Sequence, residues 1–368
     1  MKTLLGKVKG ILDKAIRRRS QALAKPFAVV DHLMHYGQDY GRQPPPKNLL
    51  DLPADIQQWF AEDVILPDQI LHELTAVRVS WHGIVVRGLQ LFVPSLAHHT
   101  YADEFTGTFL VRQWLSKSLA SDKVTGLVYD YWAYSNYYHW LVDTLPRLLL
   151  LRERYPDCVL LVPEPVRSYM KTTIAALGFK AVQAVPRGYF VNVQKLIMPS
   201  HIAPPGKQDP GLMRQLRQEL TKSVMPVTIA AASPGKRLYV SRSKQIIRRL
   251  SNENELLALL AQYAIETIYF EDMDFEQQVE AMQNVELLMG VHGANLTNML
   301  FLATGAKIVE LFNQTICNPC YFHLASNLEL DYYAVPCAPV IGTGAAHIPN
   351  SEDILVDFAV LAHTLAHL

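Results

Sequence analysis

The segment LLMGVHGANLTNMLFLATGAKIVEL, residues 287–311, indicates the fold class of this chain. Its two ends, 287–290 and 308–311, have the length and composition of buried strands, and the residues between them suit a helix. Similar apolar runs predict further strands at 238–241, 267–270 and 332–335. Strands that alternate with helices in this way are typical of a parallel sheet covered by helices. We therefore predict an α/β domain in this half of the chain.

Two helices of this domain carry capping sequences. Asn252 and Glu255 are three residues apart, as are Asp274 and Gln277, and each pair has the form of a capping box. The side chain at the first position can then accept from the backbone at the second, while the second side chain returns the bond. We expect helices to begin at Asn252 and Asp274.

The first half of the chain alternates in the same way. Its predicted elements are strands at 127–133, 158–162 and 195–198, with helices at 146–155 and before residue 177. Short apolar runs separated by glycines at 77–93 predict additional strands and turns. A Pro- and Gly-rich stretch around one polar helix, 203–235, is the predicted connection to the second domain.

The predicted fold is α/β, with two Rossmann-like α/β domains that face a cleft and a basic helix at the N-terminus. A length of 368 residues suits two domains of roughly 150 residues each. The predicted boundaries are 1–25 for the basic amphipathic helix, 26–225 and 226–345 for the two domains, and 346–368 for a C-terminal helix.

The composition excludes several classes of protein. Half of the residues are hydrophobic and 18% are charged, as in a globular protein with a large core. The 34 basic and 34 acidic residues balance, which argues against a protein whose whole surface binds nucleic acid. No apolar run approaches the roughly 18 residues of a membrane span. Four cysteines are too few for a disulfide-stapled secreted protein, so we expect free thiols and a reducing compartment.

The first 25 residues predict a basic amphipathic helix. Residues 1–19 hold seven basic groups and one acid, with apolar residues at helical spacing. Such a helix can bind an anionic membrane surface, or it can dock on its own domain with a solvated basic face. A mitochondrial presequence is a third alternative. Because no secretory signal is evident, we expect a cytoplasmic protein, with this helix as a candidate peripheral anchor at the inner face of the membrane.

The turn GVHGANLTN, residues 290–298, carries the sharpest chemical signal. Gly293 allows close approach of the backbone to a ligand, and the following helix presents unpaired N–H groups with the positive end of its dipole. His292 can donate to a diphosphate oxygen at the sheet edge where α/β proteins bind their ligands. The alternative is a tight strand-to-helix turn whose histidine is satisfied within the protein.

A second segment, KRLYVSRSKQIIRR at 236–249, carries six basic residues and no acid. Arg242 and Lys244 directly follow a predicted strand, so we expect them at the same sheet edge as His292. Arg binds phosphate bidentately and Lys binds it as a point charge, so the convergence predicts a diphosphate pocket. Glu310, which closes the next strand, is a candidate acceptor for ribose hydroxyls. A solvated basic face is the alternative for such a charge run.

The first half contains a candidate acid/base group. Residues 129–140 hold seven aromatic side chains, which can stack on sugar rings or fill a core. His139, Asp143 and Arg147 follow at a spacing of four, near one face of a helix, and Pro146 predicts that the regular helix begins there. A carboxylate that orients a histidine, or acts as a base itself, suits acid/base chemistry with an arginine to control its charge. A buried charge network that holds the helix is the alternative.

Other motifs are weak or absent. Asp272 and Asp274 have the form of a metal-nucleotide motif without a third carboxylate, and Cys317 and Cys320 lack the second pair of a zinc site. No dinucleotide fingerprint, Walker lysine loop or nucleophile elbow occurs, which argues against dehydrogenases, ATPases and hydrolases. Since a cationic pocket removes a strict need for metal, we expect no cofactor.

Three ordered segments together resemble glycosyltransferase family 61. They are NYYHWLVDTLPR at 136–147, RLYVSR continuing to RLSNE at 237–253, and GVHGANLTN with GAKIVE at 290–310. The family includes plant xylosyltransferases, animal protein O-linked N-acetylglucosamine transferases and bacterial members near polysaccharide gene clusters. The resemblance covers about residues 125–340. It departs from the family at Asn295, where glycine is more usual, and at Thr304, where proline is more usual.

This resemblance implies a GT-B fold and an inverting transfer of a hexose or pentose from a nucleotide sugar. The resemblance implies donor contacts for Arg242, His292, Gly293 and Glu310. The remaining candidate donor-binding residues lie in the same segments and are Arg237, Lys244, Arg249, Ala294 and Asn295. The implied catalytic residues facing the acceptor are His139, Asp143 and Arg147, with His139 or Asp143 as the base.

The expected acceptor is a glycan or lipid-linked glycan, as in cell-surface or capsular polysaccharide synthesis. We expect no nucleic-acid partner. A nucleotide-sugar epimerase with the same cleft is one alternative, and a non-catalytic glycan-binding protein is another.

Overall fold

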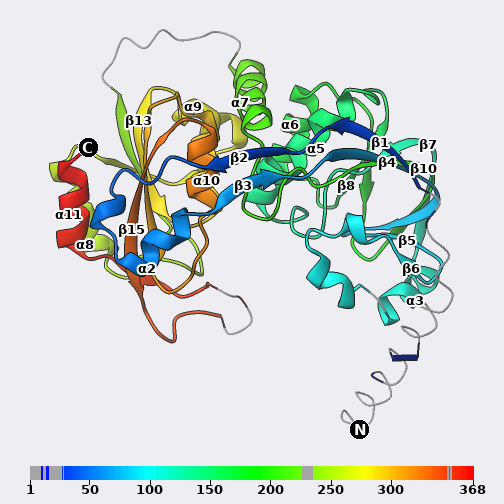
Figure 1. The fold of residues 1–368 in the computed structure, drawn as a ribbon, viewed down its shortest axis with the longest axis horizontal. Coiled ribbons are helices and arrows are strands. Elements are labelled where there is room, and N and C mark those ends of the chain that lie inside the picture. Colours follow the sequence, from blue (N-terminus) through cyan, green and yellow to red (C-terminus); the bar gives the residue numbers. More distant parts are fainter. Residues whose placement is uncertain are drawn as a thin grey trace. The chain divides into compact units, whose positions relative to one another are not determined.

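The computed structural model describes residues 29–105, 107–225, 235–345 and 350–368, together with Gly10, Lys14, Ala15, Phe27 and Ile348. Apart from three of these positions, the predicted helix at 1–25 lies outside the described residues. The chain forms two compact units, Met1–Gly37 with Pro67–Pro205 and Gln38–Leu66 with Gly206–Leu368 (Figure 1). Each is built on a sheet that contains parallel strands, so the predicted α/β class is confirmed.

The predicted domain boundaries stay a prediction. The compact units divide the chain after Pro205 rather than after residue 225, and they do not separate the two terminal segments. The second unit includes Gln38–Leu66, a segment from the first half of the sequence that we call the strap. The strap contains the hairpin β2 (Gln38–Arg42) and β3 (Asp63–Leu66), with α2 (Ala54–Gln57) and the short 3-10 helices η1 (Leu49–Asp51) and η2 (Gln58–Phe60) between the strands.

The first unit contains an eight-stranded sheet in the order β6-β5-β4-β10-β7-β8-β9, with β1 paired to β4. Its strands are β1 (Val29–His35), β4 (Gln69–Ser80), β5 (Val85–Arg87), β6 (Gln90–Leu91), β7 (Ser118–Gly126), β8 (Val159–Pro163), β9 (Val182–Val185) and β10 (Phe190–Pro199). β10, β7, β8 and β9 are parallel, whereas β4 pairs antiparallel with its neighbours. In the sheet, β8 lies on one side of β7 and β10 lies on the other side. The strand order therefore reverses between β7 and β10, where open α/β sheets bind ligands.

The helices of the first unit lie on both sides of β7 in the sequence. Before it come the 3-10 helices η3 (Val93–Ser95) and η4 (His99–Asp103) and the helix α3 (Thr108–Leu115). After it come α4 (Tyr137–His139), the π-helical turn η5 (Trp140–Thr144), α5 (Leu145–Arg152) and α6 (Ser168–Ala176). The predicted elements at 146–155, 158–162 and 195–198 are confirmed as α5, β8 and part of β10. Pro146 lies in the first turn of α5, as predicted.

The predicted strand at 127–133 is wrong, because β7 ends at Gly126. Leu127, Val128 and Tyr129 are buried but lie past the end of the strand, so their apolar character reflects burial rather than strand pairing. β7 itself has several exposed polar residues and lacks the apolar run that marks a buried strand.

The second unit has a six-stranded sheet in the order β12-β11-β13-β14-β15-β16. Its strands are β11 (Lys236–Val240), β12 (Glu266–Ile268), β13 (Val285–Val291), β14 (Lys307–Asn313), β15 (Asp331–Pro339) and β16 (Ile354–Leu355). The first five are parallel, and all five were predicted. Numbered along the chain they follow the order 2-1-3-4-5 of flavodoxin-like folds, whose ligand crevice lies between the first and third strands. In this unit those strands are β11 and β13.

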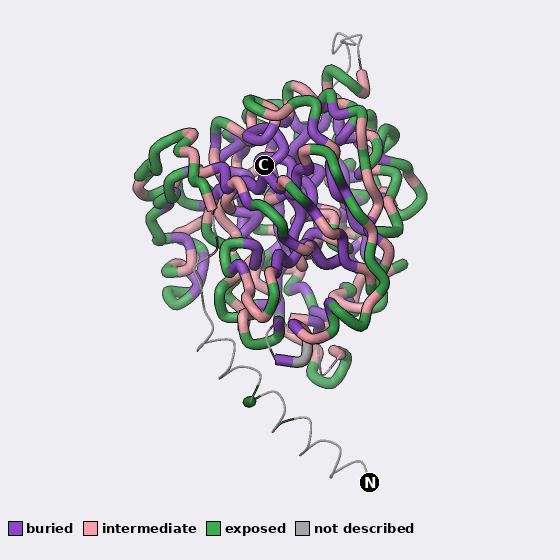
Figure 2. Tube along the Cα trace, turned by 90° about the vertical axis from the view of Figure 1, so that its right-hand side faces the viewer, coloured by how far each residue is buried: buried purple, intermediate pink, exposed green. Residues whose placement is uncertain are grey.

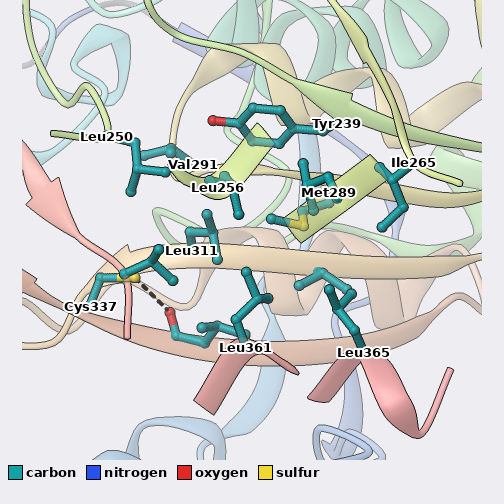
Figure 3. Close-up of a cluster of buried hydrophobic side chains, with 14 of the residues drawn as sticks. Tyr239, Leu250, Leu256, Ile265, Met289, Val291, Leu311, Cys337, Leu361 and Leu365 are labelled. Carbon is teal, nitrogen blue, oxygen red and sulfur yellow. Dashed lines mark hydrogen bonds between the residues drawn. The ribbon is translucent and has the colours of Figure 1, made fainter. Parts of the chain in front are cut away.

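Alternation along the strands gives this sheet two different faces. Its helices are α7 (Pro210–Val224), α8 (Glu253–Gln262), α9 (Phe275–Ala281), α10 (Cys320–Asn327) and α11 (Phe358–Ala366), with 3-10 helices η6 (Phe270–Asp272) and η7 (Ala294–Phe301). On one face Leu256 of α8 and Leu361 of α11 join Met289 and Leu311 in an apolar core (Figure 3). Phe322 of α10 packs on the other face. Figure 2 shows that the buried residues lie mostly in the interior and the exposed residues mostly in the outer segments.

One of the two predicted capping boxes is confirmed. Asp274 accepts from the Gln277 backbone at 2.8 Å, and the Gln277 side chain accepts from the Asp274 backbone at 2.9 Å. The prediction for Asn252 is wrong in its contacts, although α8 does begin there. Its amide instead exchanges two hydrogen bonds with the backbone of Val356, a residue 104 positions away. Asn252 therefore binds a distant segment of the chain instead of capping its own helix.

Two further findings concern the whole described chain. All four cysteines are free, as expected. Within the described residues, no helix combines the length and apolar character needed to cross a membrane.

Candidate functional site

The carboxyl ends of β11 and β13 bring Arg242 and Gly293 together. Val240 lies beside Gly290 in the sheet, so the residues that follow both strands emerge at one edge. The Arg242 guanidinium lies directly over Gly293, where a built Cβ would clash with Nη1 and lie 2.8 Å from Cζ. The predicted convergence of the basic segment and the 290–298 turn is confirmed. Gly293 has an extended backbone, so a side chain is excluded by the arginine rather than by φ.

Arg242 is a buried cation without a carboxylate partner. Its side chain is only 5% exposed, and Nε donates to the Arg248 carbonyl at 3.1 Å. Burial, aided by the charge of Arg248, lowers the pKa of Arg242 to about 10. Within the described part of the chain no acidic oxygen lies within ion-pair distance of it. Glu271 stabilises its charge at longer range. A buried cation that forms no ion pair among the described residues, at a ligand-binding edge, favours an anionic ligand.

His292 is held by a buried carboxylate on the next strand. Its Nδ1 lies 2.5 Å from Oε1 of Glu310, and its Nε2 lies 3.3 Å from Nδ2 of Asn318. The second oxygen of Glu310 accepts from the Tyr332 hydroxyl at 2.6 Å. Glu310 is 1% exposed with both oxygens occupied. The contacts therefore do not fit its predicted role as a ribose acceptor, and Glu310 instead orients His292.

Lys244 and Asn295 lie at the rim of this edge beside acidic residues. Lys244 Nζ pairs with Asp272 at 2.5 Å and lies 4.7 Å from the Tyr269 ring centre. Asn295 donates to Glu271 at 3.3 Å. The segment after Gly293 is helical from Ala294, but it forms a 3-10 helix.

The other two predicted cations have different surroundings. Arg249 makes two hydrogen bonds, at 3.1 and 2.9 Å, to Asp353, which anchors the basic loop. A polar cavity of about 460 Å³ opens beside this pair. Arg237 lies at the amino end of β11, where it donates to the Tyr263 carbonyl at 3.0 Å. The structure therefore does not bring Arg237 to the edge that carries Arg242.

In the first unit, the helical segment after β7 forms a His–Asp pair. His139 Nδ1 lies 2.6 Å from Oδ2 of Asp143, and the Trp132 ring packs against His139 at a centroid distance of 5.0 Å. Burial disfavours the charge on His139, but the hydrogen bond and charge of Asp143 outweigh it, so its pKa is raised above 6.5. Asp143 lies in the π-helical turn, a deviation that occurs often at functional sites.

Arg147 shares that helix but binds elsewhere. It is 1% exposed, and its Nε and Nη2 donate to the carbonyl of Pro199, at the end of β10, at 3.1 and 2.7 Å. Burial lowers its pKa to about 10, against the favourable charges of Asp130 and Asp143. Arg147 thus holds the helix against the sheet, as in the alternative of a buried charge network. Its contacts do not support a role beside the acceptor.

Two residues of this cluster were missed from the sequence. Asp130 follows β7, is 2% exposed, and accepts from the backbone of Trp132 and Ala133 at 2.8 and 3.0 Å. His201 follows β10, and its Nδ1 lies 3.7 Å from Asp130. Burial and the charge of Arg147 lower the pKa of His201 to about 4. The strand order could have identified these two residues, because β7 and β10 flank the point where this order reverses and ligands bind.

The aromatic run divides between packing and the site. Tyr129, Tyr138 and Trp140 are buried, whereas Trp132 and Tyr134 are half-buried near the His–Asp pair or Trp81. Among the described residues, no group of three or more His, Cys, Asp or Glu could hold a metal ion.

The second unit therefore has the strand order and the cationic edge of α/β proteins that bind phosphate-bearing ligands. Residues 137–309 match the model of the family described as Glycosyltransferase 61. The resemblance inferred from the three segments is confirmed. The match includes His139, Arg242 and His292 but ends before Glu310.

Two relatives illustrate the similarity. The EGF domain-specific O-linked N-acetylglucosamine transferase of Drosophila melanogaster is 40% identical over 90 residues, 24% of this chain and 17% of that protein. The protein O-linked-mannose beta-1,4-N-acetylglucosaminyltransferase 2 of Takifugu rubripes is 24% identical over 331 residues, 87% of this chain and 50% of that protein. The chain thus spans at most half the length of these two relatives.

Proposed function

We propose that this chain is an inverting glycosyltransferase that takes an N-acetylglucosamine-like sugar from a nucleotide donor. The proposal rests chiefly on Arg242, a buried cation that forms no ion pair with any described residue and lies at the ligand-binding edge of the segment matched by the glycosyltransferase 61 model. The sugar is suggested by the names of the relatives, which are N-acetylglucosamine transferases. The acceptor is a hydroxyl of a glycan or lipid-linked glycan.

The donor diphosphate binds at the carboxyl ends of β11 and β13. Arg242 donates to its oxygens, and His292 donates from Nε2 when its ring carries a proton on both nitrogens. Lys244 adds a point charge at the rim. As the bond to the anomeric carbon breaks, negative charge grows on the leaving diphosphate, and these fixed donors stabilise it. Glu310 keeps the His292 ring in place without contacting the ligand.

The acceptor hydroxyl loses its proton to the His–Asp pair of the first unit. Asp143 accepts from Nδ1 of His139, which leaves Nε2 as the proton acceptor. The oxygen that results attacks the anomeric carbon from the face opposite the diphosphate, which inverts its configuration. This step requires the two units to face a shared cleft, as in GT-B enzymes. The cytoplasmic location and the membrane-binding N-terminal helix also remain part of the proposal.

A panel of nucleotides tests this function. We expect UDP, GDP or ADP, or the corresponding nucleotide sugar, to raise the melting temperature of the full chain, because a ligand that binds only the folded state stabilises it. Release of nucleoside diphosphate in the presence of a glycan acceptor should follow. If no member of the panel binds, the donor site is wrong. Conversion of the nucleotide sugar without an acceptor would instead support an epimerase.

Replacing Gly293 with alanine is expected to weaken UDP binding by about tenfold, since the new methyl group displaces the Arg242 guanidinium from its place. Stability should change little, because the clashing atoms end a flexible side chain and alanine adopts the extended backbone. Isothermal calorimetry gives the affinity, with Gly211→Ala in α7 as the control. Equal UDP affinities in the two variants would contradict the assignment.

A further inference from the structure

The strap covers the sheet face that carries Glu310. Lys47 N donates to the backbone carbonyl of Tyr332 at 2.8 Å. The side chain of Asn48, 8% exposed, exchanges two hydrogen bonds with the backbone of Ala334, at 2.8 and 3.0 Å. The strap therefore pairs with β15 through both backbone and side chain, and it holds this strand at the position of Tyr332.

The ring of Tyr332 is fixed by two aromatic neighbours. Phe60 of the strap lies at a centroid distance of 6.0 Å, and Phe322 of α10 at 5.6 Å. Phe60 and Phe322 also pack edge to face on each other at 5.0 Å. Tyr332 is only 4% exposed, so its hydroxyl has one direction, towards Glu310. Burial, with the charge of Glu310, keeps the pKa of this hydroxyl well above 10, and it remains a donor at neutral pH.

We infer that Tyr332 is a positioning residue for the donor site, which acts on His292 through Glu310 and is itself held by the strap. The tyrosine hydroxyl occupies one carboxylate oxygen at 2.6 Å, and the other faces Nδ1 of His292 at 2.5 Å. With the carboxylate anchored at both oxygens, the imidazole ring has a single orientation and Nε2 faces outward from the pair. The inference rests on the proposed function, because the ligand that His292 meets is the donor diphosphate.

A matched pair of variants tests this role in the full chain. Tyr332→Phe removes only the hydroxyl that reaches Glu310, whereas Tyr333→Phe makes the same change on the opposite face, in the apolar core. We expect Tyr332→Phe to weaken UDP binding by about tenfold in calorimetry, while Tyr333→Phe leaves it unchanged.

The ¹⁵N spectrum of the histidines supplies a readout that packing alone would not move. While the tyrosine hydroxyl holds one oxygen of Glu310, the other oxygen accepts from Nδ1 of His292. Loss of the hydroxyl frees the carboxylate to turn, so the His292 signals should shift in Tyr332→Phe and stay in place in Tyr333→Phe. Arg242, Tyr321 and Asn318, which lie near the same turn, are unchanged in both variants.

The outcomes separate this inference from the proposed function. If both variants bind UDP equally and give the same His292 ¹⁵N signals, Tyr332 does not position the site. If Tyr332→Phe does not fold, or if wild type binds no UDP, the ¹⁵N spectrum of wild-type histidines decides. The inference expects the His292 proton on Nδ1 when the ring is neutral, and a proton on Nε2 would overturn it. Failure of wild type to bind any nucleotide rejects the proposed function alone.

Discussion

Arg242→Ala is expected to weaken UDP binding by about 100-fold, the largest loss from any single change at the donor edge. A hydrogen bond between charged groups contributes about 1.5–3 kcal/mol, and each 1.4 kcal/mol changes the dissociation constant about tenfold. Arg242 is buried, so water cannot replace it easily as a partner of the diphosphate. Calorimetric titration of the full chain with UDP measures the loss.

The stability of the same variant should behave differently from its affinity. Arg242 is buried without an ion-pair partner in the described part of the chain, so its removal also removes an unfavourable desolvation term. We therefore expect the free energy of unfolding of ligand-free Arg242→Ala to lie within about 1 kcal/mol of wild type.

Arg237→Ala is the matched control for Arg242→Ala. It makes the same change at the amino end of β11, whereas Arg242 follows the carboxyl end of this strand. Arg237 donates there to the carbonyl of Tyr263. UDP affinity should be unchanged in this variant. Equal losses in both variants would show that general charge, rather than the edge formed by Arg242 and Gly293, attracts the nucleotide.

Asp143→Asn is expected to lower the turnover number for sugar transfer by about 10²- to 10⁴-fold, the range that a positioned acid/base group contributes. An asparagine can donate to Nδ1 of His139 and so shift the proton to Nε2, where the base is needed. UDP affinity should be unchanged, since the donor residues lie in the other unit. Asp157→Asn, an exposed aspartate of the same unit, is the control.

His139→Ala and the double variant identify the base. If His139 and Asp143 act as one pair, the double variant should be no slower than the slower single variant. If Asp143 is itself the base, His139→Ala should retain most of the rate that Asp143→Asn loses. Wild-type turnover by Asp143→Asn would reject both assignments.

The pH dependence of turnover follows from the raised pKa of His139. The neutral imidazole is the active form, so the rate should fall as the pH drops through a value above 6.5. Without the carboxylate of Asp143, burial is the main remaining influence on His139, and burial lowers the pKa of this histidine. The acidic limb of Asp143→Asn should therefore move to lower pH, and a limb that stays in place would exclude His139 as the titrating group.

The second sheet was predictable because its signals are local. Five parallel strands produce five short apolar runs, and the helices between them separate these runs along the chain. Once the strands are parallel, residues that directly follow them share one edge. The meeting of Arg242 with the His292 turn was therefore accessible from sequence, as was the capping box at Asp274.

Contacts between distant segments were not predictable in this way. β7 was missed because its exposed polar residues hide the strand pattern, and Asn252 binds Val356 rather than its own helix. Arg147 binds Pro199, and Glu310 binds Tyr332. Both contacts depend on packing between segments that a local sequence pattern cannot place side by side.

Residue types and their spacing thus carried the α/β class, the family resemblance and the chemistry available at each strand end. Tertiary packing assigned the roles of the individual side chains. It buried Arg242 without an ion-pair partner among the described residues and turned Glu310 towards His292. It also brought the strap from the first half of the chain onto β15. The reason is that the period of an apolar pattern is encoded locally, whereas the partner of a buried polar group depends on which remote segment excludes water from it.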